Sequence, residues 1–216
     1  MTADARPLRP GRPAPPPASL AARLAAGADA WAAGRSRLVR LPLVALLAYI
    51  GVRQFASADT ASVFSAINLG IHEAGHFVFA PLGQVLHAAG GTILQLAAPL
   101  AAAWMFLRQP DYFAVSVCLG WLSTNLHHVG TYMTDAEAMR LPLVSVGPAD
   151  SVTHDWRFLL ERFDLLHRCE AIGAATHGLA HATMLASLVA LAALGVRRRR
   201  SRPNQSTSSR CGTPIG

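Results

Sequence analysis

The chain has 216 residues, of which 52% are hydrophobic and only 14% are charged, whereas a soluble domain usually carries about a quarter of charged residues. Because the apolar residues also come in long runs, this composition excludes an ordinary soluble protein and indicates an integral membrane protein. Every basic residue is an arginine, the net charge is +7, and the arginines gather near the two ends. This distribution suits anionic lipid headgroups better than nucleic acid, so we expect a lipid bilayer and no nucleic acid as partner.

The first half of the chain begins with a polar segment and continues with two apolar runs. Residues 1–36 are rich in Ala, Pro and Arg and predict a disordered tail. The first run, 38–52 with an extension to 56 at most, is short for a bilayer about 30 Å thick, which needs about 20 residues. The second run, 60–81, is long enough to cross, and Pro81 ends it. A loop is expected over residues 83–91.

The second half contains three further apolar runs and one amphipathic segment. The runs are 92–107, which Pro99 interrupts, 112–133, which is less apolar, and 171–196. Residues 154–168 repeat large apolar side chains every three to four positions, which predicts an amphipathic helix on the membrane surface or capping the bundle. A basic, disordered tail is expected over 197–216. The predicted fold class is all-α, a polytopic transmembrane helix bundle of about four to six membrane segments over residues 37–196.

The second apolar run contains His72-Glu73-Ala74-Gly75-His76, which has the pattern H-E-x-x-H. On a helix, positions i and i+4 project from one face, so His72 and His76 have the spacing of two zinc ligands. Glu73 then lies where a carboxylate can hold and deprotonate a metal-bound water. The apolar flanks argue against a solvated helix with a chance pair of histidines, because buried polar groups cost free energy unless they are satisfied. We interpret the motif as a site for Zn²⁺ with Glu73 as its catalytic group.

A catalytic zinc site needs three protein ligands and an open position for water, so a third ligand is expected elsewhere. Asp135 is the first choice, because it follows an apolar run and precedes a Leu-Pro-Leu turn; an ordinary turn aspartate is the alternative interpretation. The other candidates are His154, Asp155, the adjacent pair His127 and His128, and the pair His177 and His181.

Each of these other candidates also has a plain structural interpretation. His127 and His128 are adjacent, so on a helix they face different ways and cannot chelate together. The pair His177 and His181 has i, i+4 spacing in an apolar helix and suits a metal or a haem, but hydrogen bonding between helices is the favoured interpretation. Asp155 stands at an expected helix start, near the positive end of the helix dipole, where it is also suited to orienting a ligand histidine.

The H-E-x-x-H segment inside a hydrophobic helix resembles the site-2 protease class of membrane-embedded zinc metallopeptidases. Those proteins pair the motif with an aspartate from a later transmembrane helix, in an L-D-G-type motif. Gly90-Gly91 and Ala98-Pro99-Leu100 are similar to the glycine-rich strand and the G-P-L element that often follow in the family, and the resemblance covers roughly residues 60–145. It implies zinc ligands at His72 and His76 and the general base at Glu73. It also implies a third ligand at Asp135, although Thr134-Asp135-Ala136 stands in place of L-D-G.

These features predict a zinc metallopeptidase of a bacterial inner (plasma) membrane that hydrolyses peptide bonds of membrane-associated proteins. The alternative is a non-catalytic multi-pass membrane protein, either an inactive protease relative or a protein that binds or transports a transition metal through its histidines. A weaker alternative is a haem-binding electron carrier that uses His177 and His181. Glu73 separates the first two hypotheses, because metal transport needs no carboxylate at that position.

Overall fold

The computed structural model describes residues 19–32, 38–57, 60–141 and 154–196. Within these ranges the chain forms α-helices and short 3₁₀ turns and contains no strand. The α-helices are α1 (Leu20–Ala32), α2 (Leu41–Ala56), α3 (Ser65–Phe79), α4 (Gln84–Arg108), α5 (Tyr112–Thr134), α6 (Asp155–Arg162) and α7 (Cys169–Val196). The predicted all-α class is therefore confirmed for the described part of the chain, and the tail expected over 197–216 lies outside it.

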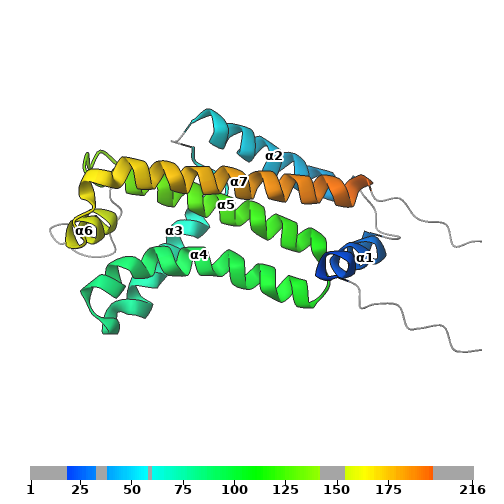
Figure 1. Cartoon of the computed structure of the whole chain (residues 1–216), viewed down its shortest axis with the longest axis horizontal. Coiled ribbons are helices and arrows are strands. Elements are labelled where there is room, and N and C mark those ends of the chain that lie inside the picture. The colour runs from blue at the N-terminus through cyan, green and yellow to red at the C-terminus, as the bar shows by residue number, and fades with distance from the viewer. Residues whose placement is uncertain (1–18, 33–37, 58–59, 142–153, 197–216) are drawn as a thin grey trace, which may run out of the picture.

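The two helices α5 and α7 pack along one another and form the centre of the molecule (Figure 1). Helix α2 lies against α7 on one side, and α4 packs on α5 on the other side. The short helix α3 packs on α4 and lies between α4 and the α5–α7 pair. Helix α6 lies at the end of the bundle where α7 begins, and α1 lies at the opposite end, where α7 finishes (Figure 1).

The prediction that residues 1–36 are disordered is wrong for Leu20–Ala32, which form helix α1. The segment Leu20–Ala32 is rich in alanine, the strongest helix former, so local propensity favours a helix despite the low content of large apolar residues. The helix also has an anchor at its end. The ring of Trp31 stacks on Phe113 with centroids 6.2 Å apart, and the Arg40 guanidinium lies 4.3 Å above the Trp31 ring. The remaining residues of this tail lie outside the described ranges.

Helix α3, which carries the histidine motif, is shorter than the expected helix over 60–81. It runs from Ser65 to Phe79 and is followed by the 3₁₀ turn Ala80–Leu82, which contains Pro81. A helix of 15 residues is about 22 Å long, which is less than the hydrocarbon thickness of about 30 Å. The prediction that this helix starts at residue 60 is therefore wrong, and α3 is not among the helices that are long and apolar enough to cross a membrane by length and composition.

The loop expected over residues 83–91 is also wrong, because the chain turns at a single residue. Gly83 has a φ of +92°, a conformation that favours glycine, and α4 starts at the next residue. Residues 84–91 form the first two turns of α4. Gly90 and Gly91, which the family resemblance associates with a strand, are therefore part of a helix.

Three helical stretches are long and apolar enough to cross a membrane: Leu38–Ala56, Gln84–Arg108 and Leu166–Leu194. Helix α5 is not among them, although it has 23 residues, because polar side chains interrupt its apolar sequence. The polar residues buried on it include Ser123, Thr124, Asn125 and His127. The amphipathic helix expected over 154–168 is limited to Asp155–Arg162, with Leu159 and Leu160 buried.

Hydrogen bonds orient α3 on α5. The Trp121 indole N–H donates to the Asn68 amide oxygen at 2.7 Å, and the Asn68 amide nitrogen donates to the Thr124 hydroxyl at 3.3 Å. Asn68, His72 and Gly75 are the buried residues of α3, and they lie on one face at the spacing of a helical turn. Fixing Asn68 on α5 therefore also fixes the direction in which the motif histidines project.

Glycines bring the backbones of α3 and α4 together beside the histidine pair. A Cβ atom added to Gly75 would collide with the carbonyl of Gly90, and one added to Gly91 would lie 2.6 Å from Nε2 of His72. Small residues at a crossing allow such a close approach of two helices in apolar surroundings. The glycines therefore let α4 reach the ring of His72.

We expect Gly75→Ala to destabilise the protein by about 1–3 kcal/mol, the usual cost of overpacking, because the colliding atom belongs to backbone and not to a flexible side chain. The matched control is Gly70→Ala on the same helix, where an added Cβ meets nothing within 4 Å. Thermal unfolding in detergent, followed by circular dichroism, measures the difference. Equal unfolding midpoints for the two variants would contradict the close crossing.

Candidate metal centre

The two histidines of the motif lie on consecutive turns of α3 and face the same space. Their ring centroids are 4.9 Å apart, with the rings nearly perpendicular. His72 is buried, and His76 is partly exposed. Because both Nε2 atoms contact the same carboxylate oxygen, the prediction that the pair projects from one face of the helix is confirmed.

The other nitrogen of each ring is held by an oxygen acceptor on α4. Nδ1 of His72 lies 3.0 Å from the amide oxygen of Gln95, and Nδ1 of His76 lies 2.8 Å from the backbone carbonyl oxygen of His87. These oxygens only accept, so Nδ1 carries the proton and donates in both rings. In the neutral form of each ring Nε2 is then the unprotonated nitrogen, and both Nε2 atoms face the same carboxylate oxygen. Metal-ligating histidines have this arrangement, in which an outer partner fixes the tautomer and the orientation of the ring.

The carboxylate between the two Nε2 atoms belongs to Asp155. Its Oδ2 atom lies 3.3 Å from Nε2 of His72 and 3.3 Å from Nε2 of His76. Zinc bonds of about 2.0–2.1 Å place two ligand atoms of a tetrahedral ion about 3.3 Å apart. The Asp155 oxygen therefore lies from each imidazole nitrogen at the separation expected of two ligands of one tetrahedral ion.

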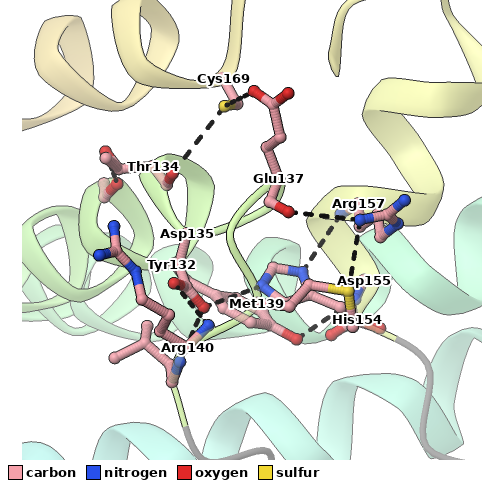
Figure 2. Close-up of polar contacts among 12 residues, drawn as sticks. Tyr132, Thr134, Asp135, Glu137, Met139, Arg140, His154, Asp155, Arg157 and Cys169 are labelled. Carbon is pink, nitrogen blue, oxygen red and sulfur yellow. Dashed lines mark hydrogen bonds and ion pairs between the residues drawn. The ribbon is translucent and has the colours of Figure 1, made fainter. Parts of the chain in front are cut away.

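Three contacts at the N-terminus of α6 position Asp155 (Figure 2). The backbone N–H of Asp155 donates to the Tyr132 hydroxyl at 3.2 Å. The neighbouring His154 caps the helix, because its Nδ1 atom accepts from the backbone N–H of Arg157 at 3.2 Å. The guanidinium of Arg157 in turn contacts the backbone carbonyl of Glu137, beyond the end of α5. Helix α6 is thereby held with its first residue directed at α3.

The charges of the site favour a cation. Burial raises the pKa of Asp155. The hydrogen bonds from His72 and His76 and the charges of these rings lower this pKa by more than burial raises it, so it lies below its ordinary value. The hydrogen bond and the negative charge of Asp155 raise the pKa of His76, which lies outside the three long apolar stretches, to about 8 against the desolvation that lowers it. Without a metal, a proton therefore occupies the place where a cation would bind.

Glu73 completes the group. The ligand atoms of His72, Glu73 and His76 all lie within 4.8 Å of one another. Glu73 and Asp155 thus both lie beside the histidine pair. The Oδ2 atom of Asp155 lies 3.3 Å from Nε2 of each ring. Asp155 is therefore the carboxylate that contacts both imidazoles, and Glu73 is the carboxylate whose ligand atom lies within 4.8 Å of the ligand atoms of both histidines.

The structure does not bring Asp135, the third ligand expected from the sequence, to the histidine pair. Asp135 caps the C-terminus of α5, and its two oxygens accept from the backbone N–H groups of Arg140 and Leu141, both at 2.9 Å. Its Oδ2 atom also lies 3.8 Å from Nε2 of His154 (Figure 2). The carboxylate thus closes the turn after α5, which is the alternative interpretation given for it above.

The remaining candidates lie elsewhere. His128 contacts the Ser65 hydroxyl at 3.3 Å, whereas His127 contacts His177, so the prediction that the adjacent pair faces different ways is confirmed. His177 and His181 join His127 in a separate cluster between α5 and α7. None of these contacts involves the motif histidines.

Three residues that support the site were not singled out from the sequence. Gln95 belongs to the apolar run expected over 92–107, and His87 belongs to the loop expected over 83–91. Tyr132 lies near the end of the run expected over 112–133. For Gln95 a signal existed, because a lone amide in an apolar helix needs a partner. For His87 none existed, because its contribution is a backbone carbonyl.

We expect Gln95→Leu to lower zinc affinity about 10–100-fold, the usual effect of removing an outer partner of a ligand histidine. The leucine fills similar space but cannot accept the Nδ1 proton of His72, so the ring loses its fixed orientation. The control is Gln84→Leu, at an exposed position on the same helix. Competition with a fluorescent zinc chelator measures the affinity, and equal affinity in both variants would show that Gln95 does not orient the ring.

Comparison with known proteins identified no relative. No protein-family model matches the chain, and searches of curated proteins and of solved structures found no match. The resemblance to site-2 proteases therefore stays a prediction from the motif.

Proposed function

We propose that the protein is a membrane-embedded zinc metallopeptidase in which His72, His76 and Asp155 hold the ion and Glu73 is the general base. The observation that carries the proposal is the position of the Asp155 carboxylate, whose Oδ2 atom lies 3.3 Å from Nε2 of each histidine. Two imidazoles and one carboxylate form a ligand set of catalytic zinc sites, which keep a fourth position open for water. The residues present therefore fit the metal that the motif implies.

The apolar surface supports a membrane location. Only 22–28% of the most apolar window in each of the three long stretches is buried inside the protein. The exposed remainder includes large apolar side chains, such as Val52, Phe55, Leu100, Trp104, Leu185 and Val189. Soluble monomers rarely expose contiguous apolar surface of this extent, whereas lipid tails cover it without cost.

The depth of the site suggests which bonds it would cut. Tyr132, which contacts Asp155, lies in the last turn of α5. Asp155 is the first residue of α6, and α6 lies at one end of the bundle (Figure 1). We therefore expect the scissile bond to lie near one membrane face, within reach of water, in a transmembrane or membrane-proximal segment of the substrate protein.

Zinc would polarise the scissile carbonyl and acidify the attacking water, lowering the pKa of that water toward about 7. Glu73 would accept the proton from this water and donate it to the leaving amine. The Gln95 amide and the His87 carbonyl keep the two imidazoles in one tautomer throughout, and the Tyr132 hydroxyl keeps Asp155 in place by accepting its backbone N–H. Each protein group thus acts from a position fixed before the substrate binds.

The proposal is tested by metal content and by product mapping. The full-length protein, purified in detergent, should contain zinc by mass spectrometry of the metal. Cells that express the protein should gain new N-termini in their membrane proteins, detected by labelling and sequencing of terminal peptides. Bound zinc without any such termini would support the non-catalytic alternative, and absence of bound metal would exclude the peptidase and the metal-binding form of the alternative.

A further inference from the structure

Contacts between helix termini define the end of the bundle at which α1 lies. Trp31 of α1 and Leu194 near the end of α7 belong to one buried apolar cluster, against which Tyr112 and Phe113 at the start of α5 pack. The guanidinium of Arg40, the residue before α2, lies 4.3 Å from the centre of the Trp31 ring and 5.5 Å from that of Phe113. The start of α2, the start of α5 and the end of α7 therefore lie together, at what we term the α1 end.

The long helices α2, α4, α5 and α7 run between the two ends of the bundle in alternating directions (Figure 1). Helix α4 finishes at Arg108, four residues before α5 starts, so it also finishes at the α1 end. At the opposite end, the α6 end, Ala136, Leu160 and Cys169 form one buried cluster that joins the end of α5, helix α6 and the start of α7. Four passes bring the chain back to where it began, so the residue before α2 and the last residue of α7 both lie at the α1 end.

The arginines are divided unevenly between these two ends. Of the 19 arginines, eleven lie in the sequence within 20 residues of the helix termini at the α1 end, and five lie near the termini at the α6 end. Six of the eleven belong to residues 197–216, four belong to residues 23–40, and Arg108 is the last. In membrane proteins an excess of basic residues in the short segments that flank the membrane-spanning helices marks the cytoplasmic side.

Pairs of aromatic and basic side chains lie near both ends of the apolar stretches. Near the end of α4, the Arg108 guanidinium lies 6.0 Å from the centre of the Trp104 ring. Near the end of α2, which runs in the opposite direction, Nη1 of Arg53 donates to the Tyr49 hydroxyl at 3.2 Å. Trp and Tyr are enriched at the two membrane–water interfaces, and arginine side chains near helix ends extend to the headgroups. A bilayer with its interfaces at these two pairs would leave the α1 end and the α6 end on opposite sides.

From these observations we infer that the α1 end faces the cytoplasm and that the metal centre opens toward the extracytoplasmic face of the membrane. The centre lies at the α6 end, because Asp155, which contacts both His72 and His76, is the first residue of α6. The consequence for the substrate rests on the proposed peptidase function. Zinc and water reach the centre from outside the cytoplasm, and the substrates are membrane proteins whose cleaved segment lies at the extracytoplasmic face.

Labelling of single cysteines with a charged maleimide, which does not cross membranes, tests the orientation in bacterial cells. The label is applied to the full-length chain without its own three cysteines. His167→Cys then provides a thiol at the α6 end, and Gln109→Cys provides one in the turn at the α1 end. Both positions are exposed, and neither change alters the arginines. His167→Cys should be labelled in intact cells, whereas Gln109→Cys should be labelled only after lysis with detergent.

Labelling of Gln109→Cys in intact cells overturns the inference, and so does labelling of His167→Cys only after lysis. Should the cysteine-free chain fail to accumulate, fusions to the C-terminus of the unchanged protein decide the question. Green fluorescent protein, which becomes fluorescent in the cytoplasm, should be fluorescent there, and alkaline phosphatase, which becomes active outside the cytoplasm, should be inactive. The reverse pattern of the two fusions overturns the inference as well.

The positions of new N-termini test the substrate class. Termini that are lost in Glu73→Gln should map to the extracytoplasmic ends of transmembrane segments, and termini at the cytoplasmic ends would overturn this class. Maleimide labelling needs neither metal nor cleavage. Absence of zinc and of new termini would therefore remove the peptidase and leave the orientation standing, whereas reversed labelling together with Glu73-dependent termini would remove the orientation and leave the peptidase.

Discussion

The variant Asp155→Asn is expected to lose zinc, with an affinity at least about 100-fold below that of the unchanged protein, which exceeds the usual effect of an outer partner. The neutral amide removes the charge that faces both Nε2 atoms at 3.3 Å and leaves two imidazoles as the main ligands. The change is nearly isosteric and keeps the backbone N–H that donates to Tyr132, so α6 should stay in place. Zinc content after gel filtration, together with chelator competition, measures the loss.

Asp135→Asn is the matched control, since it makes the same chemical change at the residue favoured by the sequence. We expect this variant to retain its zinc. It should be less stable, because the carboxylate accepts hydrogen bonds from two backbone N–H groups and the amide leaves one of them without its charged acceptor. The opposite pattern, with zinc lost in Asp135→Asn and kept in Asp155→Asn, would return the third ligand to Asp135.

Glu73→Gln is expected to bind zinc as well as the unchanged protein and to cleave about 10²–10⁴-fold more slowly, which is the usual contribution of a general base. The amide keeps the shape of the side chain beside His72 and His76 but cannot accept a proton at neutral pH. The measurement is the rate at which the new N-termini of membrane proteins appear in cells expressing equal amounts of each form.

The control for Glu73 is Glu170→Gln, at an exposed position in the first turn of α7. This variant should form the same termini at the same rate. If termini persist unchanged in Glu73→Gln while its zinc is bound, Glu73 is not the base. If zinc is lost as well, Glu73 contributes to binding the ion instead.

The parts of the site that the sequence predicted are those set by local geometry. His72, Glu73 and His76 lie within two turns of one helix, so the periodicity of the helix alone brings them together. The pattern of apolar runs likewise predicted α2, α5 and α7 closely, and it predicted α4 from residue 92 onward, because burial or lipid exposure favours long apolar runs. The prediction of disorder for residues 1–36 was wrong at α1. There the high alanine content favours a helix although large apolar side chains are few.

The proposed third ligand, Asp155, was one of the candidates left open, and the sequence could not favour it because its contact with the pair spans 83 positions. The template of the family directed attention to Asp135 at the end of an apolar run, and the residue that reaches the pair begins the next helix. Its sequence did contain the relevant feature, a polar pair, His154 and Asp155, ahead of an amphipathic repeat. No periodicity relates that pair to α3, and the packing of α6 against α4 and α5 brings them together.

The proposed ligands come from two different helices, and this affects how the stability of the fold depends on the concentration of metal. The two proposed histidine ligands belong to α3 and the proposed aspartate ligand is the first residue of α6, so an ion bound there would join two segments that lie far apart in the sequence. Any ligand that binds the native state alone stabilises it by mass action, by about 2.7 kcal/mol at 100 times its dissociation constant. The melting temperature of this protein should therefore rise with free zinc, and a cell short of zinc would keep less of it folded.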